Sequence, residues 1–213
     1  MARANSITVA RGARDMETEL LLASEPDDMR RAADLLRRGR IVAFPTETVY
    51  GLAARADDAE AVEALRRLKG RPAGKEFTLL IASPADAGTY ATLGRAAGLL
   101  AERFWPGPLT LVVPARRGGE VGLRCPDCGA ARELVRLTAA PLAAPSANLS
   151  GEPPALTPAE VLRNFGGRIA AVLDGGPAVL GASSTVVRAR GDAVEILRQG
   201  ALAEADVRAA LRR

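Results

Sequence analysis

Lys69 and Arg71 are the pair of side chains whose types and spacing best suit chemistry on a phosphate. A lysine offers a compact positive charge and an arginine a planar fork of donors, so together they can neutralise phosphate oxygens. The pair ends an apolar pattern of helical period over residues 59–68. A structural explanation is also open, because cations stabilise the C-terminal end of a helix, and Gly70 and Pro72 are typical of helix ends. The segment that follows lacks the glycine spacing and the Ser or Thr of a Walker A loop, which excludes that kind of phosphate site.

Three polar side chains, Thr46, Glu47 and Thr48, follow a predicted buried strand. Residues 41–44 are an apolar run long enough for one strand, and Pro45 ends or bends it because proline cannot donate to a sheet ladder. Functional residues often lie on loops held by rigid elements, and this loop leaves the end of a strand. On spacing alone, an ordinary turn is the alternative.

Two further turns are rich in hydroxyl and amide groups. Ser146 and Asn148 lie in the segment APSANLSG, after a short apolar stretch, and Ser184 lies in GASSTVV, which leads into a predicted strand. Such side chains can contact a ligand, or they can satisfy backbone groups of their own turn. The residue types leave both interpretations open.

Two arginines, Arg124 and Arg198, lie at the ends of predicted strands. A guanidinium can bind a carboxylate or a phosphate through two parallel hydrogen bonds. For both residues the alternative is a charge on the protein surface.

The composition limits the chemistry that these residues can perform. At 213 residues the chain fits one domain, and its 48% apolar and 25% charged residues are ordinary for a soluble protein. A net charge of +4 permits an anionic ligand, but with 3% aromatic residues it does not favour a single-stranded RNA platform. Histidine is absent, which removes the usual general base and the commonest metal ligand. We expect no protein metal site, no membrane span, no signal peptide and a cytoplasmic location.

Cys125 and Cys128 form a CxxC pattern that we interpret as coincidence. A zinc site needs about two more ligands, and the sequence has no histidine or further cysteine. A redox pair would open a helix, whereas this one follows a predicted strand, and Pro126 disfavours helical backbone at Cys125.

The periodicity predicts an α/β fold with a mixed sheet, because strands and helices occur without a strict βαβ repeat. A hydroxyl at Ser24 followed by Pro26 indicates a helix start, and Thr157 with Glu160 reads as a capping box. The predicted strands are residues 7–9, 19–23, 41–44, 78–82, 109–113, 121–124, 142–144, 170–173, 185–188 and 193–197. The predicted helices are residues 26–38, 59–68, a helix opened by Ser83 and Pro84, 94–104, 130–137, 158–165 and 204–211.

Four motifs, PTETVYGL, LKGRP, PGPLT and APSANLSG, occur in that order. On these motifs the chain resembles the YrdC family of threonylcarbamoyl-adenylate synthases, over roughly residues 26–200. The resemblance implies an open twisted sheet of parallel and antiparallel strands, flanked by helices, around a deep cationic cavity. We expect a single domain over residues 1–213, with an N-terminal arm and edge strand at 1–25 and a C-terminal helix at 201–213. Some members carry an extra C-terminal domain, for which we expect this chain to be too short.

The resemblance also implies which residues form the site. The two implied catalytic residues are Lys69 and Arg71. The implied nucleotide-binding residues are Lys69, Arg71, Ser146, Asn148 and Arg198. The residues implied to hold threonine are Thr46, Arg124 and Ser184. Many relatives have histidine or another polar group where this chain has Cys128, so no role is carried over to that position.

The reaction implied by the resemblance joins L-threonine, bicarbonate and ATP, with Mg²⁺, into threonylcarbamoyl-adenylate and pyrophosphate. Separate enzymes would transfer the product to tRNA, and weak RNA binding would be compatible with the charge. Two alternatives stay open. One is an RNA-binding or ribosome-associated module of the same fold, and the other is a carbamoyl-adenylate-forming enzyme of metalloenzyme maturation.

Overall fold

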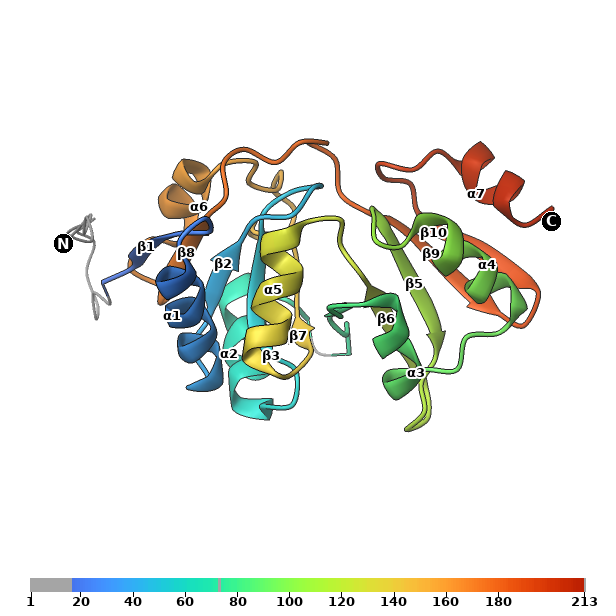
Figure 1. Ribbon diagram of the computed structural model, residues 1–213, viewed down its shortest axis with the longest axis horizontal. Coiled ribbons are helices and arrows are strands. Elements are labelled where there is room, and N and C mark those ends of the chain that lie inside the picture. The colour runs from blue at the N-terminus through green and yellow to red at the C-terminus, as the bar shows by residue number, and fades with distance from the viewer. Residues whose placement is uncertain (1–16, 73, 213) are drawn as a thin grey trace.

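The computed structural model of the protein describes residues 17–72 and 74–212, which are built on one twisted sheet (Figure 1). The strand order is β1-β8-β2-β3-β7-β4-β6-β5-β9-β10. The pairs β1–β8, β2–β8, β4–β6 and β5–β9 are parallel and the others antiparallel, so the sheet is mixed as the sequence predicts.

The strands are β1 (Glu19–Leu22), β2 (Val42–Phe44), β3 (Gly51–Arg55), β4 (Leu79–Leu80), β5 (Leu109–Pro114), β6 (Glu120–Arg124), β7 (Leu142–Ala143), β8 (Ala171–Asp174), β9 (Thr185–Arg190) and β10 (Ala193–Arg198). The helices are α1 (Pro26–Arg37), α2 (Ala59–Lys69), α3 (Ala87–Tyr90), α4 (Arg95–Phe104), α5 (Gly129–Thr138), α6 (Pro158–Phe165) and α7 (Glu204–Ala210), with a 3₁₀ turn η1 at Pro84–Asp86.

Helices cover both faces of the strands β1, β8, β2, β3 and β7, which we call the covered half. Val42 and Phe44 of β2 belong to the apolar cluster that contains residues of α1 and α5. Ala43, between them, belongs to the cluster that contains residues of α2 and α6. Because successive side chains of a strand point to opposite faces, the continuous apolar run buries both sides of the strand.

Helices cover only one face of the strands β4, β6, β5, β9 and β10, which we call the open half. Leu109, Leu111 and Val113 of β5 pack in an apolar cluster with residues of α4 and α7. Thr110 and Val112, which alternate with them, line a cavity instead. The same alternation holds along β6 and β9, so the second face of this half forms a wall of the cavity.

Of the two helix starts that the sequence signals predicted, the structure confirms the capping of one and gives a different cap for the other. The capping box of Thr157 and Glu160 at the start of α6 is confirmed. The start of α1 is different, because its N-cap is Glu25 rather than Ser24 and makes no side-chain bond. Instead, the Asp28 carboxylate accepts a hydrogen bond from the last backbone N–H of β1.

Strand β3 was not predicted, and β4 is shorter than predicted. The sequence GLAAR of β3 has little β-propensity, but the strand pairs with β2 and with β7, and this tertiary pairing decides its conformation. Gly51, at its start, lies against Phe44, whose ring would stand 2.7 Å from a Cβ built on Gly51. A side chain at this position would therefore displace the ring.

The predicted strand at 7–9, and the arm that precedes residue 17, lie outside the described residues. Within the described ranges, no helix is both long and apolar enough to cross a bilayer.

Candidate functional site

A cavity of about 660 Å³ lies between the open face of the sheet and the loops that leave the covered half. Every predicted site residue except Asn148 lines it, and these are Thr46, Lys69, Arg71, Arg124, Ser146, Ser184 and Arg198. The cations of the lining are Lys69, Arg71, Lys75, Arg124, Arg188 and Arg198, against the acids Glu76 and Glu120. Loops far apart in the sequence thus meet at one hollow with a surplus of positive charge.

Arg124 joins the two sides of the cavity through a buried ion pair. It ends β6 of the open half, and its Nη2 donates to Glu47 Oε1 and to Thr48 Oγ1, both at 2.8 Å. The side chains of Arg124 and Glu47 are only 9% and 11% exposed. The alternative of a surface charge is therefore wrong for Arg124. Its described hydrogen bonds use Nη2 and Nε, which leaves Nη1 for a ligand.

The Thr46 hydroxyl is bonded mainly within its own loop. It lies 2.6 Å from the Val49 carbonyl and 2.7 Å from Thr48 Oγ1, and it accepts from the backbone N–H groups of Thr48 and Val49. Thr46 thereby holds the turn that presents Glu47 and Thr48 to Arg124. A bond from this hydroxyl to a ligand would replace one of these contacts.

Lys69 reaches from the end of α2 into the loop that contains Ser146 and Asn148. Its ammonium Nζ donates to the carbonyls of Ser146 and Asn148, both at 2.6 Å, and to Asn148 Oδ1 at 2.8 Å. Burial, followed by the charge of Arg71, lowers the pKa of Lys69 from 10.5 to about 8. The lysine is only 4% exposed, although it lines the cavity.

Arg71 is held against the loop that follows it. Its Nε donates to the Lys75 carbonyl at 2.9 Å and its Nη2 to the Glu76 carbonyl at 2.6 Å. Its guanidinium also lies over the ring of Phe77, 4.9 Å from the centroid. Burial, with a further effect of Arg66, lowers the pKa of Arg71, but an arginine keeps its charge under such conditions.

Arg198 and Ser184 form a third polar group, on the open half. Arg198 Nη2 donates to the Ser184 carbonyl at 2.8 Å and to Ser184 Oγ at 3.2 Å. Ser184 Oγ also lies 2.8 Å from Thr110 Oγ1, which belongs to β5. Burial, and then the charges of Arg124 and Arg71, lower the pKa of Arg198. Arg198 is exposed although it lines the cavity, so the structure does not exclude a surface charge at this position.

Two members of this site, Glu47 and Thr110, were not predicted to take part. Glu47 Oε2 is buried and has no hydrogen-bond partner among the described residues. Both residues stand inside motifs that the sequence singled out, PTETVYGL and PGPLT. The motifs could therefore have indicated that Glu47 and Thr110 belong to the site. Their partners, Arg124 and Ser184, could not be paired with them from sequence because they are 77 and 74 positions away.

The two cysteines lie nearer to a helix than the sequence predicted. Cys128 is the N-cap of α5, so the CxxC does stand at a helix start. Burial nevertheless raises the pKa of Cys125 to about 11 and also raises that of Cys128, which disfavours the thiolates that redox chemistry needs. Both cysteines are free. Across the described ranges, no three His, Cys, Asp or Glu side chains gather as a metal site.

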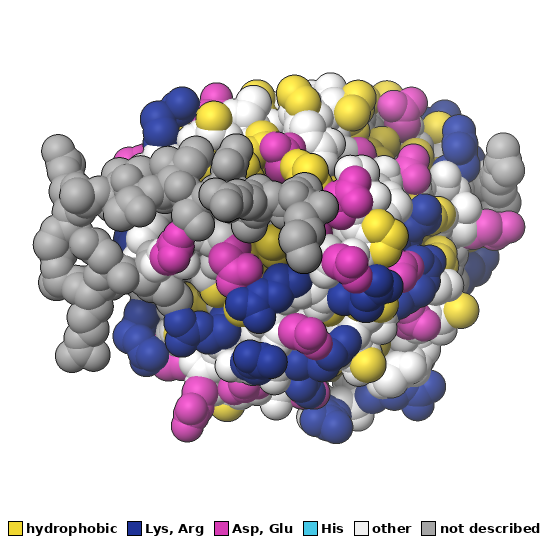
Figure 2. All heavy atoms as spheres, turned by 60° about the vertical axis from the view of Figure 1, so that its left-hand side comes forward, with side chains coloured by type: hydrophobic (Ala, Val, Ile, Leu, Met, Phe, Trp, Pro, Cys, Tyr) yellow, Lys and Arg dark blue, Asp and Glu magenta, His cyan; other side chains and the backbone are white. Residues whose placement is uncertain are grey.

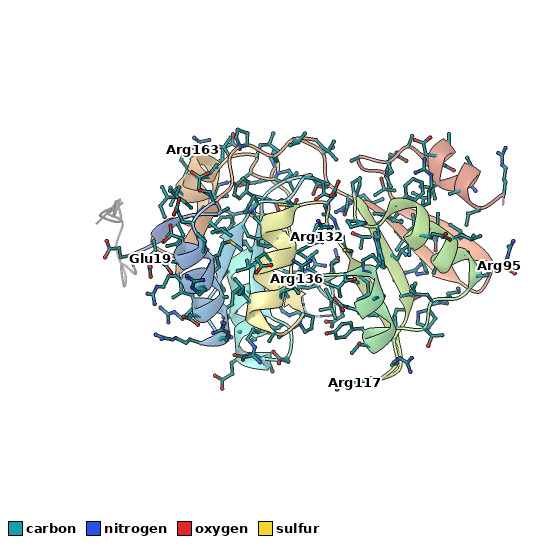
Figure 3. The ribbon with its side chains drawn as sticks, in the orientation of Figure 1. Glu19, Arg95, Arg117, Arg132, Arg136 and Arg163 are labelled. Atoms are coloured by element: carbon teal, nitrogen blue, oxygen red, sulfur yellow. The ribbon has the colours of Figure 1, made fainter. Side chains whose placement is uncertain are left out.

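On the outer surface, positive and negative side chains are mixed, whereas the cavity lining has a surplus of positive charge. Figure 3 shows Arg95, Arg117 and Arg163 at the periphery of the molecule. On the face drawn in Figure 2, Lys and Arg side chains are interspersed with Asp and Glu. Among the described residues that this view shows, charges of both signs are thus mixed.

The fold and the cavity define an α/β protein whose sheet and loops enclose a cavity lined by more cations than acids. The family model Sua5/YciO/YrdC, described as telomere recombination, matches residues 34–200. The chain belongs to this family.

Curated relatives cover most of the chain. It is 39% identical over 205 residues to the threonylcarbamoyl-AMP synthase of Bacillus subtilis, an alignment that covers 91% of this chain and 59% of the relative. It is 42% identical over 184 residues to the threonylcarbamoyl-AMP synthase of Pyrococcus abyssi, which covers 82% of this chain and 54% of the relative. The chain thus spans less than two thirds of the length of these relatives.

The solved structure of P. abyssi Sua5 complexed with L-threonine has the same fold. It superposes with a TM-score of 0.85 at 37% identity, over 91% of this chain and 60% of that one.

Proposed function

We propose that this chain forms threonylcarbamoyl-adenylate and pyrophosphate from L-threonine, bicarbonate and ATP. The observation that carries the proposal is the meeting of Lys69, Arg124 and Arg198, with neighbouring hydroxyls, at one cavity of about 660 Å³. A site for an amino acid and a triphosphate needs cations and hydroxyls at separate points of one hollow. The names of the curated relatives, and the threonine complex of P. abyssi Sua5, support the same substrates.

The first step makes a carbamate. The threonine amine attacks bicarbonate, a nitrogen–carbon bond forms and water leaves. In the second step a carbamate oxygen attacks the α-phosphorus of ATP, the bond from that phosphorus to the bridging oxygen breaks, and pyrophosphate leaves. Such a displacement needs alignment and neutralisation of charge more than a protein nucleophile. The absence of histidine is compatible with this chemistry.

On the threonine side, Arg124 Nη1 would bind the carboxylate, because Nη2 is already bonded to Glu47 and Thr48. Thr46 would act mainly by holding this turn, and Ser184 would offer its oxygen from the opposite wall. On the nucleotide side, Arg71 and Arg198 would neutralise phosphate oxygens, and Ser146 would bond the nucleotide from its loop. Asn148 lies outside the cavity lining, so its part would be to shape that loop.

Mg²⁺ would enter with ATP rather than occupy a protein cage. Mg²⁺ commonly binds through one or two carboxylates together with water and substrate phosphates. Glu76 and Glu120 are the carboxylates of the cavity lining, and Glu120 already accepts from Arg188 and Arg190. The phosphates would thus supply most of the ligands, and the ion would add charge neutralisation there.

Pyrophosphate release from ATP, with threonine and bicarbonate each omitted in turn, tests the proposal. We expect release only when both are present. Release without threonine, or release that needs carbamoyl phosphate, would instead favour a carbamoyl-adenylate-forming enzyme. Binding of RNA without any ATP turnover would favour the RNA-binding module. We further propose a single YrdC-like domain over this chain, a cytoplasmic location and delivery of the product to separate tRNA-modifying enzymes.

A further inference from the structure

The ammonium of Lys69 is fully engaged by the loop of residues 146–150, which we call the SAN loop. A lysine ammonium has three hydrogens to donate. Its three acceptors are the carbonyls of Ser146 and Asn148 and the Asn148 side-chain oxygen, at 2.6 to 2.8 Å. All the acceptors belong to this one loop, 77 to 79 positions away in sequence.

The connection also runs in the opposite direction. Ser150 Oγ donates to the backbone carbonyl of Lys69 at 3.0 Å, so the last residue of α2 is bonded to the SAN loop through both its side chain and its main chain. Asn148 Oδ1 additionally accepts from Ser146 Oγ at 2.6 Å. The Asn148 amide therefore joins the lysine to the serine that lines the cavity.

On its other side the SAN loop is attached to β3. The Ala147 N–H donates to the Tyr50 carbonyl, and the Leu52 N–H donates to the Pro145 carbonyl. These bonds fix the start of the loop against the sheet, but they do not reach Asn148 or Ser150. Within the far part of the loop, the Asn148 amide donates to the Glu152 carbonyl and the Glu152 N–H donates to the Leu149 carbonyl. Lys69 supplies the bonds that join this part to α2, through its ammonium and its backbone carbonyl.

A phosphate bonded directly to Lys69 would take a hydrogen bond away from the SAN loop. The lysine is 4% exposed, and the Asn148 carbonyl has no other donor among the described residues, so loss of this bond would be unfavourable by about 1–3 kcal/mol. Arg71 and Lys75 line the same cavity, and Lys75 makes no described side-chain hydrogen bond. Lys75 can therefore meet the phosphates, and Arg71 can offer Nη1, because its described hydrogen bonds use Nε and Nη2.

We propose that Lys69 is a positioning residue, which holds the SAN loop in place so that Ser146 faces the nucleotide, rather than a direct phosphate ligand. The proposal rests on the proposed function for the identity of the nucleotide. The hold on the loop is a property of the protein before ligand binds, and it can be measured without turnover.

Hydrogen–deuterium exchange of the unliganded protein tests this hold. In Lys69→Met we expect the amides of residues 148–152 to exchange at least about ten-fold faster, because several hydrogen bonds of about 1 kcal/mol each are lost together. The matched control is Lys75→Met, which removes one positive charge from the same cavity and should leave these amides at the wild-type rate. Wild-type exchange in Lys69→Met would overturn the proposal.

Ser150→Ala provides a second test outside the cavity lining. It removes the hydroxyl that bonds the Lys69 carbonyl and leaves every cavity charge in place. We expect faster exchange over the same amides and an affinity for ATP with Mg²⁺, measured by calorimetry, that is weaker by about five-fold, the equivalent of one hydrogen bond. Unchanged exchange and unchanged affinity would overturn the proposal.

The two proposals fail in different ways. If no pyrophosphate is formed but Lys69→Met loosens the SAN loop, the proposed reaction is wrong and the positioning role stands. If pyrophosphate is formed and the loop in Lys69→Met exchanges as in the wild type, the reaction stands and the positioning role of Lys69 is wrong.

Discussion

The covered half and the open half of the sheet contribute to the site in opposite ways. In the covered half both faces are buried under helices, and the site residues Thr46 and Ser146 lie on the loops beyond the strands. In the open half one face is free, and Thr110 and Arg124 point into the cavity from the strands themselves. Thr110 and Arg124 are therefore flanked along the chain by core residues.

This difference predicts where substitutions affect stability and where they affect only activity. On a loop, a side chain can be removed without touching an apolar cluster. On the face of the open half, Thr110 and Arg124 have core residues as neighbours in sequence, such as Leu123 beside Arg124. Each prediction below tests one side of this comparison against the other, or two positions within one side.

The largest effect is expected for Arg124→Met. Removal of one partner of a buried ion pair is typically destabilising by about 3–5 kcal/mol, because the other charge is left uncompensated. Glu47 would lose its partner on Oε1 while Oε2 already has none among the described residues. We expect the free energy of unfolding in urea to fall by about 3 kcal/mol and turnover with threonine to be lost.

Arg188→Met is the matched control on the same open face. The Arg188 side chain is 34% exposed and pairs with Glu120 and Glu195 near the outer end of the cavity. Exposed pairs contribute about 0–1 kcal/mol. If Arg124→Met and Arg188→Met lost the same free energy of unfolding, the buried and the more exposed ion pair of this face would contribute equally to stability.

Arg71→Ala tests the loop side, where activity should suffer and stability should not. Loss of one preorganised donor to developing charge typically lowers turnover by about a hundred-fold or more. Arg71 is bonded to the carbonyls of Lys75 and Glu76 on a surface loop, so we expect the unfolding free energy to change by less than about 1 kcal/mol.

Arg67→Ala is the control for Arg71, since it removes an arginine from the same helix end outside the main cavity. Pyrophosphate release measured for both variants should show a large loss in the first and wild-type rates in the second. Wild-type turnover in Arg71→Ala would remove that residue from the site.

Gly200→Ala probes how the open half holds Arg198 and Ser184. A Cβ on Gly200 would lie 2.3 Å from the Ser183 carbonyl oxygen and 2.4 Å from the Ser184 carbonyl carbon, both backbone atoms. Relief of such contact needs the backbone to shift, and we expect a loss of about 1–3 kcal/mol in thermal or urea unfolding.

The matched control is Gly98→Ala, in the interior of α4, where a Cβ would meet nothing within 4 Å. Alanine is a better helix former than glycine by about 0.5–1 kcal/mol, so this variant should gain stability. If both variants gained stability, the close approach of Gly200 to the backbone of Ser183 and Ser184 would not affect the free energy of unfolding.

The parts of this molecule that were predicted from sequence depend on short-range patterns or on the family motifs. The capping box of Thr157 and Glu160 needs only residues three apart. The roles of Glu47 and Thr110 were missed because their partners, Arg124 and Ser184, are 77 and 74 positions away and meet them only through the sheet order.

Strand β3 illustrates the same limit for the fold. Its alanines carry no strand signal of their own, and its conformation follows from pairing with β2 and β7. The motifs correctly indicated the loops that meet at the cavity, but a motif cannot say which of its residues faces the cavity. Asn148, which stands in a motif and yet lies outside the lining, is an example.

Two hydroxyls, Thr46 and Thr110, compare a loop with a sheet face directly. Thr46→Val would leave the backbone N–H groups of Thr48 and Val49 without their acceptor, and an unsatisfied buried donor is unfavourable by about 1–3 kcal/mol. Thr110→Val would remove only one of the contacts of Ser184 Oγ, which keeps Arg198 as a partner. We expect a larger loss of unfolding free energy in Thr46→Val, and about a five-fold rise in KM for threonine in Thr110→Val. A reversed order of stability would contradict the assignment of Thr46 to its own turn.

The last comparison is between Lys69 and Arg198, whose charges we expect to respond differently to pH. Burial lowers the pKa of Lys69 to about 8, so the lysine is protonated at pH 7 and mostly neutral at pH 9. Arg198, on the open half, keeps its charge across this range although burial lowers its pKa too. A polyphosphate favours the charged lysine, so its binding raises the pKa of Lys69 and takes up a fraction of a proton near pH 8. The affinity for ATP should therefore be flat below pH 7 and fall by up to about ten-fold by pH 9, because one pKa unit corresponds to a factor of ten. Calorimetry in buffers of different ionisation enthalpy measures both quantities, and Lys69→Arg should abolish the fall. A fall that persisted in Lys69→Arg would assign the titration to another group and leave the two halves alike in their response to pH.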